Sequence, residues 1–187
     1  MSVRELLEAA ARAVEDSELA DAISQKNEKS NEQFKKKAER LLACFNAIQS
    51  DVAINYLAPT ARVDLTREST QLDDISSRLI RIVGVYTKEG NYAVDYDICG
   101  DALIVNGLGV YAVYEYIPED SDIEGEFYYK DKIIGKRAFV YGVCAEYCLL
   151  EMRYEESSNW ESRYRQAVEI KTDYKRRRLK ASNRWGL

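Results

Sequence analysis

The hydrophobic positions near the start of the chain recur at the spacing of an amphipathic helix. Between residues 2 and 15 they form one stripe, made of Val3, Leu6, Leu7, Ala10, Ala13 and Val14. Ser2 and Glu5 have the spacing of a capping box, in which each side chain bonds to the other residue's backbone N–H. We therefore predict a helix over residues 2–15. The polar stretch that follows has room for one further helical turn at Leu19–Ile23.

A longer stripe follows and predicts a second, long helix over residues 30–57. Its apolar residues recur in steps of four or three: Phe34, Ala38, Leu41, Phe45, Ile48, Val52 and Tyr56. Ser30 and Gln33 repeat the capping-box spacing at its start. The helix should end before Pro59, because the residue ahead of a proline disfavours the α conformation.

The middle of the chain changes from helical to strand patterning. Segments rich in Val, Ile and Tyr alternate with turn signals that contain Gly, Asn or Asp. The candidate strands are residues 79–87, 92–98, 102–106 and 110–117. This pattern predicts an antiparallel meander of about four strands, with one face toward water. Residues 121–135 are expected to form a loop with one short strand.

Helical spacing returns after Gly135 and continues to the end of the chain. Two adjacent apolar stripes run through the first of these helices: Ala138, Tyr141, Ala145, Cys148 and Met152, and Phe139, Val143, Tyr147, Leu150 and Tyr154. A helix that is apolar over so wide an arc should be buried against more than one neighbour. A polar break at 155–158 then precedes a last helix, for which Ser158 and Glu161 give a third capping box.

The predicted fold class is therefore α+β. A helical bundle is formed by residues 1–58 and 135–180, and an antiparallel β-meander domain, residues 59–134, is inserted between the second and third predicted helices. Residues 181–187 are expected to be a flexible C-terminal tail.

The amino-acid composition argues against several classes of function. The chain has 187 residues, a net charge of −5 and no histidine, and the acidic balance argues against a general nucleic-acid binder. The absence of histidine removes Ser-His-Asp and Cys-His sites, histidine metal sites and the commonest general base. No apolar run approaches the ~20 residues of a membrane span, and the N-terminus lacks the apolar core of a signal peptide. We expect a protein that is made in a cytosol and is not an enzyme.

Two groups of residues, the cysteines and an acidic segment, could in principle bind a metal or carry redox chemistry. For both, a structural role explains the sequence better. Cys144 and Cys148 share one helical face, but a structural zinc needs four ligands, and Cys44 and Cys99 have no paired spacing. We predict that Cys144 and Cys148 are core residues. An acidic segment comprises Glu115, Glu119, Asp120, Asp122, Glu124 and Glu126. It lacks the EF-hand ligand order, so a solvated loop is favoured over a metal-dependent enzyme, and no catalytic, cofactor or metal residue is predicted.

The basic run from Lys175 to Lys180 is the main functional candidate. Cations near a helix C-terminus interact favourably with the helix dipole. Four consecutive basic residues are more than this interaction explains. The predicted partner-binding residues are Arg176, Arg177, Arg178, Lys180, Arg184 and Trp185. Docking on an acidic protein surface is favoured over nucleic acid, because the sequence shows no second basic patch with interleaved aromatic residues.

The order of elements and several short motifs resemble a known family. The motif residues are Tyr141, Gly142, Ala145, Tyr147, Leu149 and Leu150, then Trp160, Tyr164 and Ala167, with a strand-to-proline exit at Tyr116 and Pro118. In this arrangement the chain resembles phage head-to-tail adaptor proteins of the tail tubular protein A and connector type. The resemblance implies a helical bundle with an inserted β-sheet domain.

The resemblance also implies a role in the virion. Such a protein forms a homo-oligomeric ring, usually of twelve copies, beneath the portal protein. Its C-terminal tails reach the portal, and its opposite side binds tail or nozzle proteins. DNA passes through the channel during genome ejection without specific binding, past a mildly acidic wall. The expected location is the neck or tail of the virion, after assembly in the host cytoplasm. The alternative is a small nucleic-acid-associated regulatory module that uses the basic run.

Overall fold

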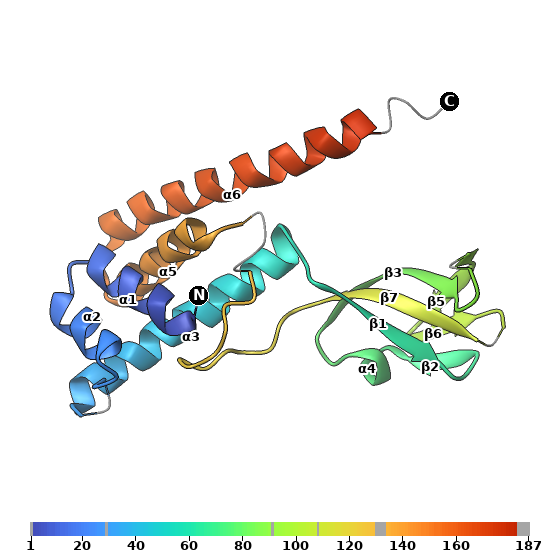
Figure 1. Cartoon of the computed structure of the whole chain (residues 1–187), viewed down its shortest axis with the longest axis horizontal. Coiled ribbons are helices and arrows are strands. Elements are labelled where there is room, and N and C mark those ends of the chain that lie inside the picture. The colour runs from blue at the N-terminus through green and yellow to red at the C-terminus, as the bar shows by residue number, and fades with distance from the viewer. Residues whose placement is uncertain (1, 29, 91, 108, 130–133, 183–187) are drawn as a thin grey trace. The chain divides into compact units, whose positions relative to one another are not determined.

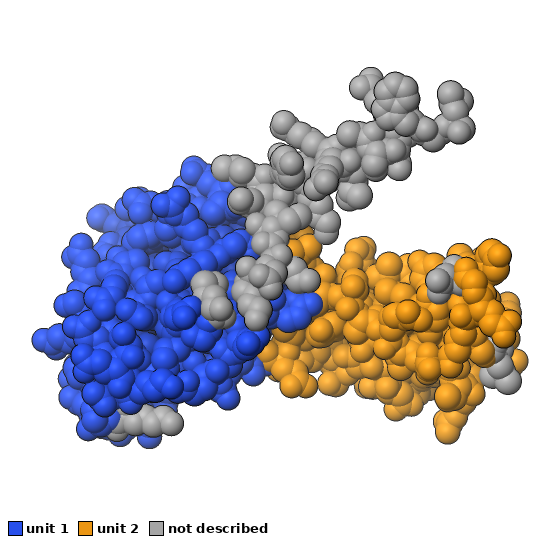
Figure 2. Space-filling view, viewed as in Figure 1, with its two compact units in different colours: residues 1–49, 120–187 blue, residues 50–119 orange. Residues whose placement is uncertain are grey.

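The chain folds into two compact units, which Figure 2 shows in different colours. The computed structural model describes residues 2–28, 30–90, 92–107, 109–129 and 134–182, and the side chains as far as Glu169. Unit 1 comprises residues 1–49 and 120–187, and unit 2 comprises residues 50–119. Helices dominate unit 1 and antiparallel sheets dominate unit 2, which confirms the predicted α+β class with a β insertion.

Unit 1 is built from helices (Figure 1). They are α1 (Val3–Ala13), α2 (Ser17–Ser24), α3 (Glu32–Asn55, whose last residues belong to unit 2), α5 (Lys136–Leu150) and α6 (Tyr154–Ser182). Helix α1 packs against α2 and α5, and α5 packs against α6. The single turn expected at Leu19–Ile23 is thus part of a complete helix, α2.

The N-terminal caps agree with the sequence at one helix and differ at the next. At α1, the Ser2 side chain accepts a hydrogen bond from the Glu5 N–H, and the Glu5 carboxylate accepts one from the Ser2 N–H. The capping box is confirmed. At α3 the predicted Ser30 cap is wrong: Asn31 Oδ1 accepts from the Gln33 N–H at 2.8 Å, while Ser30 Oγ donates to Asn27 O. Asn31 directly precedes the first helical residue, where its short side chain can reach that N–H.

The break between α5 and α6 lies earlier than predicted. The chain turns at residues 151–153, so Ser158 and Glu161 fall inside α6 and the third capping box is wrong. Met152 has φ +60°, its N–H donates to Leu149 O, and the Arg153 N–H donates to Cys148 O at 2.8 Å. This pair of bonds is a Schellman motif, which ends a helix with one left-handed residue.

The same motif ends α1 and α2, again without glycine. Glu15 has φ +66° and Lys26 has φ +59°, and the two backbone bonds of the motif are present at both helix ends. Glycine is the usual residue at this position because a side chain there costs energy. The sequence therefore carries no conventional stop signal at any of these three helix ends.

An aromatic cluster fills the core of unit 1. Phe45 of α3, Phe127 and Tyr129 of the incoming loop, and Phe139 of α5 are all fully buried. The Phe127 and Phe139 rings meet edge to face, with centroids 4.7 Å apart, the favoured geometry for such pairs. The loop that follows the insertion thus belongs to the helical unit. The second unit comprises residues 50–119, whereas the sequence suggested an insertion of 59–134, and this packing explains why it ends at residue 119.

Unit 2 contains two antiparallel sheets. Its elements are β1 (Thr60–Leu65), β2 (Ser69–Gln71), α4 (Leu72–Ile75), β3 (Leu79–Thr87), β4 (Ala93–Val94), β5 (Tyr96–Cys99), β6 (Ala102–Val105) and β7 (Val110–Tyr116). The sheet orders are β1-β7-β3-β4 and β2-β6-β5. The predicted strands exist, with residues 92–98 split between the two sheets. The simple meander is wrong, because β7 lies between β1 and β3 instead of at an edge.

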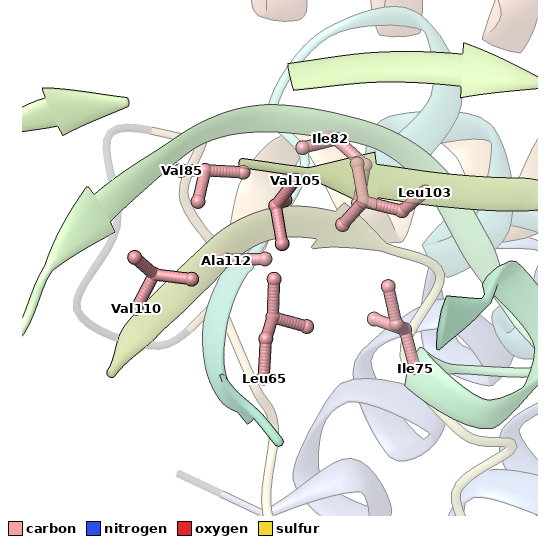
Figure 3. Packing of buried hydrophobic residues seen from close by; sticks show 8 residues of the cluster. All are labelled: Leu65, Ile75, Ile82, Val85, Leu103, Val105, Val110 and Ala112. Atoms are coloured by element: carbon pink, nitrogen blue, oxygen red, sulfur yellow. The ribbon is translucent and has the colours of Figure 1, made fainter. Parts of the chain in front are cut away.

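The two sheets share one hydrophobic core (Figure 3). Its buried members are Leu65, Ile75, Ile82, Val85, Leu103, Val105, Val110 and Ala112. Leu103 and Val105 come from the three-stranded sheet, and Ile75 comes from α4. Burial of these aliphatic side chains from both sheets stabilises unit 2 as a compact body.

One buried guanidinium connects three segments of unit 1. Arg4 of α1 is 8% exposed, and its Nη atoms donate to both oxygens of Glu28 at 3.0 and 2.9 Å. Nη1 also donates to Ile23 O, and Nη2 donates to Glu124 in the loop that returns from unit 2, at 2.6 Å. The hydrogen bond from Arg4 holds the pKa of Glu124 below its usual value.

The Arg4 cluster yields a stability prediction. Arg4→Met should lower the free energy of unfolding by about 3–5 kcal/mol, because it removes a buried guanidinium that donates two hydrogen bonds to the buried Glu28 carboxylate. Arg4→Met combined with Glu28→Met should lose much less. The matched control is Arg12→Met on the same helix, whose ion pairs are exposed and screened by solvent, so it should lose far less than Arg4→Met. Urea unfolding measures all three, and equal losses for Arg4→Met and Arg12→Met would contradict the account.

The left-handed helix ends yield a second prediction. Met152 is 75% exposed, so its side chain contributes little packing to the isolated chain. Met152→Gly should raise the free energy of unfolding by about 1 kcal/mol, because it removes the cost of a side chain at positive φ. Met152→Val, with a β-branched side chain, should lower it. A thermal unfolding series checks the order Gly, Met, Val, and a loss of stability in the glycine variant would refute the explanation.

Candidate interaction site

The predicted partner-binding residues fall in and beyond the last helix. Arg176, Arg177, Arg178 and Lys180 lie on the C-terminal half of α6, in a part whose side chains are not described. Arg184 and Trp185 lie outside the described residues. Six of the ten residues from 171 to 180 are Lys or Arg. The backbone of α6 therefore places the basic run on a continuous helix.

Helix α6 is much longer than the helix it packs against. It has 29 residues, whereas α5 has 15. The first turn of α5 lies level with Arg163 to Ala167, since both line the same cavity. The 14 remaining residues of α6, from Glu169 to Ser182, extend past α5 for roughly 21 Å at about 1.5 Å per residue. We call this part the basic overhang, and Figure 1 shows α6 continuing beyond α5.

A second basic cluster lies where the overhang begins. Lys136 and Arg137 of α5 and Arg163 of α6 line an open cavity of about 650 Å³ together with Tyr141. Trp160 adjoins it, with its ring centroid 5.6 Å from that of Tyr141. We call this cavity the basic cleft.

The basic cleft is electrostatically unbalanced. Within the part of the chain that the structure describes, no carboxylate forms an ion pair with Lys136, Arg137 or Arg163. The Arg163 guanidinium lies 4.7 Å from the Trp160 ring centroid, and that of Arg137 lies 6.0 Å from the Tyr141 ring centroid. The N-terminal end of α5 adds the positive pole of its helix dipole. The cleft is thus suited to a ligand that combines carboxylates with apolar groups.

The basic cleft corrects the sequence-based expectation. The sequence showed no second basic patch with aromatic neighbours, because residues 136–141 and 160–167 each contribute only part of it. The packing of α5 on α6 brings the two segments together. Helical spacing predicted both helices, but it did not predict which of their turns meet.

The turn between α5 and α6 carries an exposed apolar surface. Its members are Leu149, Leu150, Met152 and Tyr154, which are 48%, 56%, 75% and 64% exposed, and we call them the turn patch. The sequence placed Leu150, Met152 and Tyr154 in buried stripes, which is wrong because the helix ends at Leu150. Four large apolar side chains exposed together within six residues are typical of an interaction surface.

The cysteines that attracted attention in the sequence are packing residues. Cys144 and Cys148 are fully buried on α5, and Cys144 Sγ lies 3.6 Å from Ala10 O. Burial raises the pKa of the Cys144 thiol to about 12, so it stays protonated at neutral pH. The predicted core role is confirmed. Cys44 is also buried, whereas Cys99 is exposed at the end of β5.

The acidic residues at 115–126 form ion pairs in different units of the structure. Glu115 pairs with Arg81 in unit 2, and Glu124 pairs with Arg4 in unit 1. Among the described residues, no group of three or more Cys, Asp or Glu side chains is arranged to hold a metal ion.

Comparison with family models and with curated proteins gives no match to this chain. None of the helices in the described part of the chain combines the length and apolar character needed to cross a bilayer.

The cysteine environments predict selective labelling. In the native protein a thiol reagent should modify Cys99 rapidly, and Cys44, Cys144 and Cys148 should react at least about tenfold more slowly, because they are buried and two have pKa values raised to about 12. Mass spectrometry of partly labelled protein measures the order, and the denatured chain, in which all should react, is the control. Rapid native labelling of Cys144 would show that α5 does not pack as described.

Proposed function

We propose that this protein is a non-enzymatic structural adaptor of a phage virion. It assembles as a ring, docks on the portal protein and links it to tail or nozzle proteins, while DNA passes through the channel without specific binding. The ring has twelve copies in the usual case for the proteins that the sequence resembles. Its place is the neck or tail of the virion, after assembly in the host cytoplasm.

The observation that carries this proposal is the basic overhang of α6. A single helix combines a packed half, anchored through the buried residues Tyr164 and Val168, with a half that extends past α5 and bears the basic run. Helical segments gain most of their stability from packing against a partner. An acidic groove on another protein would supply that packing and neutralise the run of like charges.

The alternative function is a nucleic-acid-associated regulatory module. The basic cleft favours it more than the sequence alone did, because it adds three cations and two aromatic rings close to the overhang. A phosphate backbone would be bound with a steep dependence on salt concentration.

Truncation tests whether the basic overhang is needed for docking on the portal. Removal of residues 176–187 should leave a folded protein, because the buried anchors Tyr164 and Val168 remain, and should abolish its incorporation onto the portal. Circular dichroism measures folding, and co-sedimentation with portal rings measures incorporation.

The matched variant Arg176→Gln, Arg177→Gln and Arg178→Gln keeps the helix length and removes only charge. It should also fail to join the portal. Normal assembly of the truncated protein would refute docking through the overhang. Tight binding of the intact protein to duplex DNA at moderate salt, with no binding to portal, would favour the regulatory module.

A further inference from the structure

The two interaction surfaces of unit 1 lie at opposite ends of one helical hairpin. The turn patch is at the closed end, where α5 passes into α6, and the basic cleft is at the open end, beside the first turn of α5. The 15 residues of α5 separate them by roughly 22 Å. One copy therefore presents both surfaces at once.

The turn patch is bordered by negative charge. Glu155 follows Tyr154 directly and is exposed. The end of α1 lies beside the turn, since the Arg153 guanidinium donates to Val14 O at 3.4 Å, and this places the exposed Glu15 at the same border. Within the described residues neither Glu15 nor Glu155 lies at ion-pair distance from a cation, although the charge of Glu15 acts on the nearby Arg153, whose guanidinium pairs with Glu156. The surface is apolar at its centre and acidic at its border.

The basic cleft has the complementary character. Its floor contains Ala138, Tyr141 and Ala167, and its border carries Lys136, Arg137 and Arg163. We propose that the turn patch of one copy binds in the basic cleft of the next copy. The apolar side chains of the patch then lie on the floor, while Glu15 and Glu155 face the unpaired cations.

The contact joins two different surfaces, so it is heterologous and repeats head to tail. Such a contact closes into a ring when its rotation allows and otherwise gives a filament. The complementary charges would direct the approach and the register, and the buried Leu, Met and Tyr side chains would supply most of the affinity. The inference rests on the proposed function in one respect, because it names the contact between neighbouring copies of the proposed ring.

Charge reversal tests the contact. The cleft variant carries Arg137→Glu and Arg163→Glu, and the patch variant carries Glu15→Lys and Glu155→Lys. All four side chains are exposed, so both variants should fold, which circular dichroism checks. Sedimentation velocity over a concentration series should give oligomers for the unaltered protein and association at least about tenfold weaker for each variant alone, since like charges then face each other.

An equimolar mixture of the two variants should recover oligomers, because every cleft then meets a patch of opposite charge. The matched control reverses Glu161 and Arg165, an exposed pair on α6 outside the lining of the cleft, and should leave association unchanged. The inference is overturned if the unaltered protein stays monomeric at every concentration, if either variant associates normally, or if the mixture fails to recover.

A measurement of portal binding distinguishes failure of the proposed contact from failure of the proposed adaptor function. If the copies associate through this contact but do not bind portal, the inference holds and the adaptor function falls. If the protein binds portal but the charge reversals leave the bound copy number unchanged, the adaptor function holds and the inference falls.

Discussion

The Arg4 guanidinium is the interaction on which the arrangement of unit 1 depends. It lies in α1 and reaches Glu28 after α2 and Glu124 in the loop that returns from unit 2, so it joins parts of the chain up to 120 residues apart. A buried charge of this kind adds little net stability, because its desolvation offsets much of its attraction. It acts beside backbone contacts that join the same segments, since the Val3 N–H donates to Gly125 O at 3.0 Å and Ser2 pairs with Glu126 in a β-bridge. That loop then places Phe127 and Tyr129 in the core against Phe139 of α5.

Helix α5, packed in this way, forms a hairpin with α6 that carries the turn patch and the basic cleft. Its buried side is occupied by small and aromatic residues, including Gly142, where an added Cβ would lie 2.9 Å from Ile48 Cδ1. Its two ends remain available, one apolar and acidic, the other basic. The overhang of α6 adds a third surface whose charge resembles that of the cleft. This distribution of surfaces supports the proposal that the protein joins copies and partners.

Sequence patterns predicted much of this fold because the signals were local. The Ser2 capping box, the stripe along α3 and strand β3 at residues 79–87 all depend on neighbouring residues. The errors have non-local or unusual causes. Met152 ends α5 in a left-handed conformation without glycine, and β7 pairs with β1 across about fifty residues, as Thr60 opposite Glu115 shows. The basic run was visible in the sequence, whereas the cleft was not, because it exists only where two helices meet.

The most direct test of the adaptor function is a mass measurement of the purified protein mixed with portal rings encoded by the same genome. Native mass spectrometry would report the number of copies bound to each ring. The account predicts one discrete complex with a fixed copy number, twelve in the usual case for the proteins that the sequence resembles. Portal rings that keep their own mass, beside free protein, would contradict it.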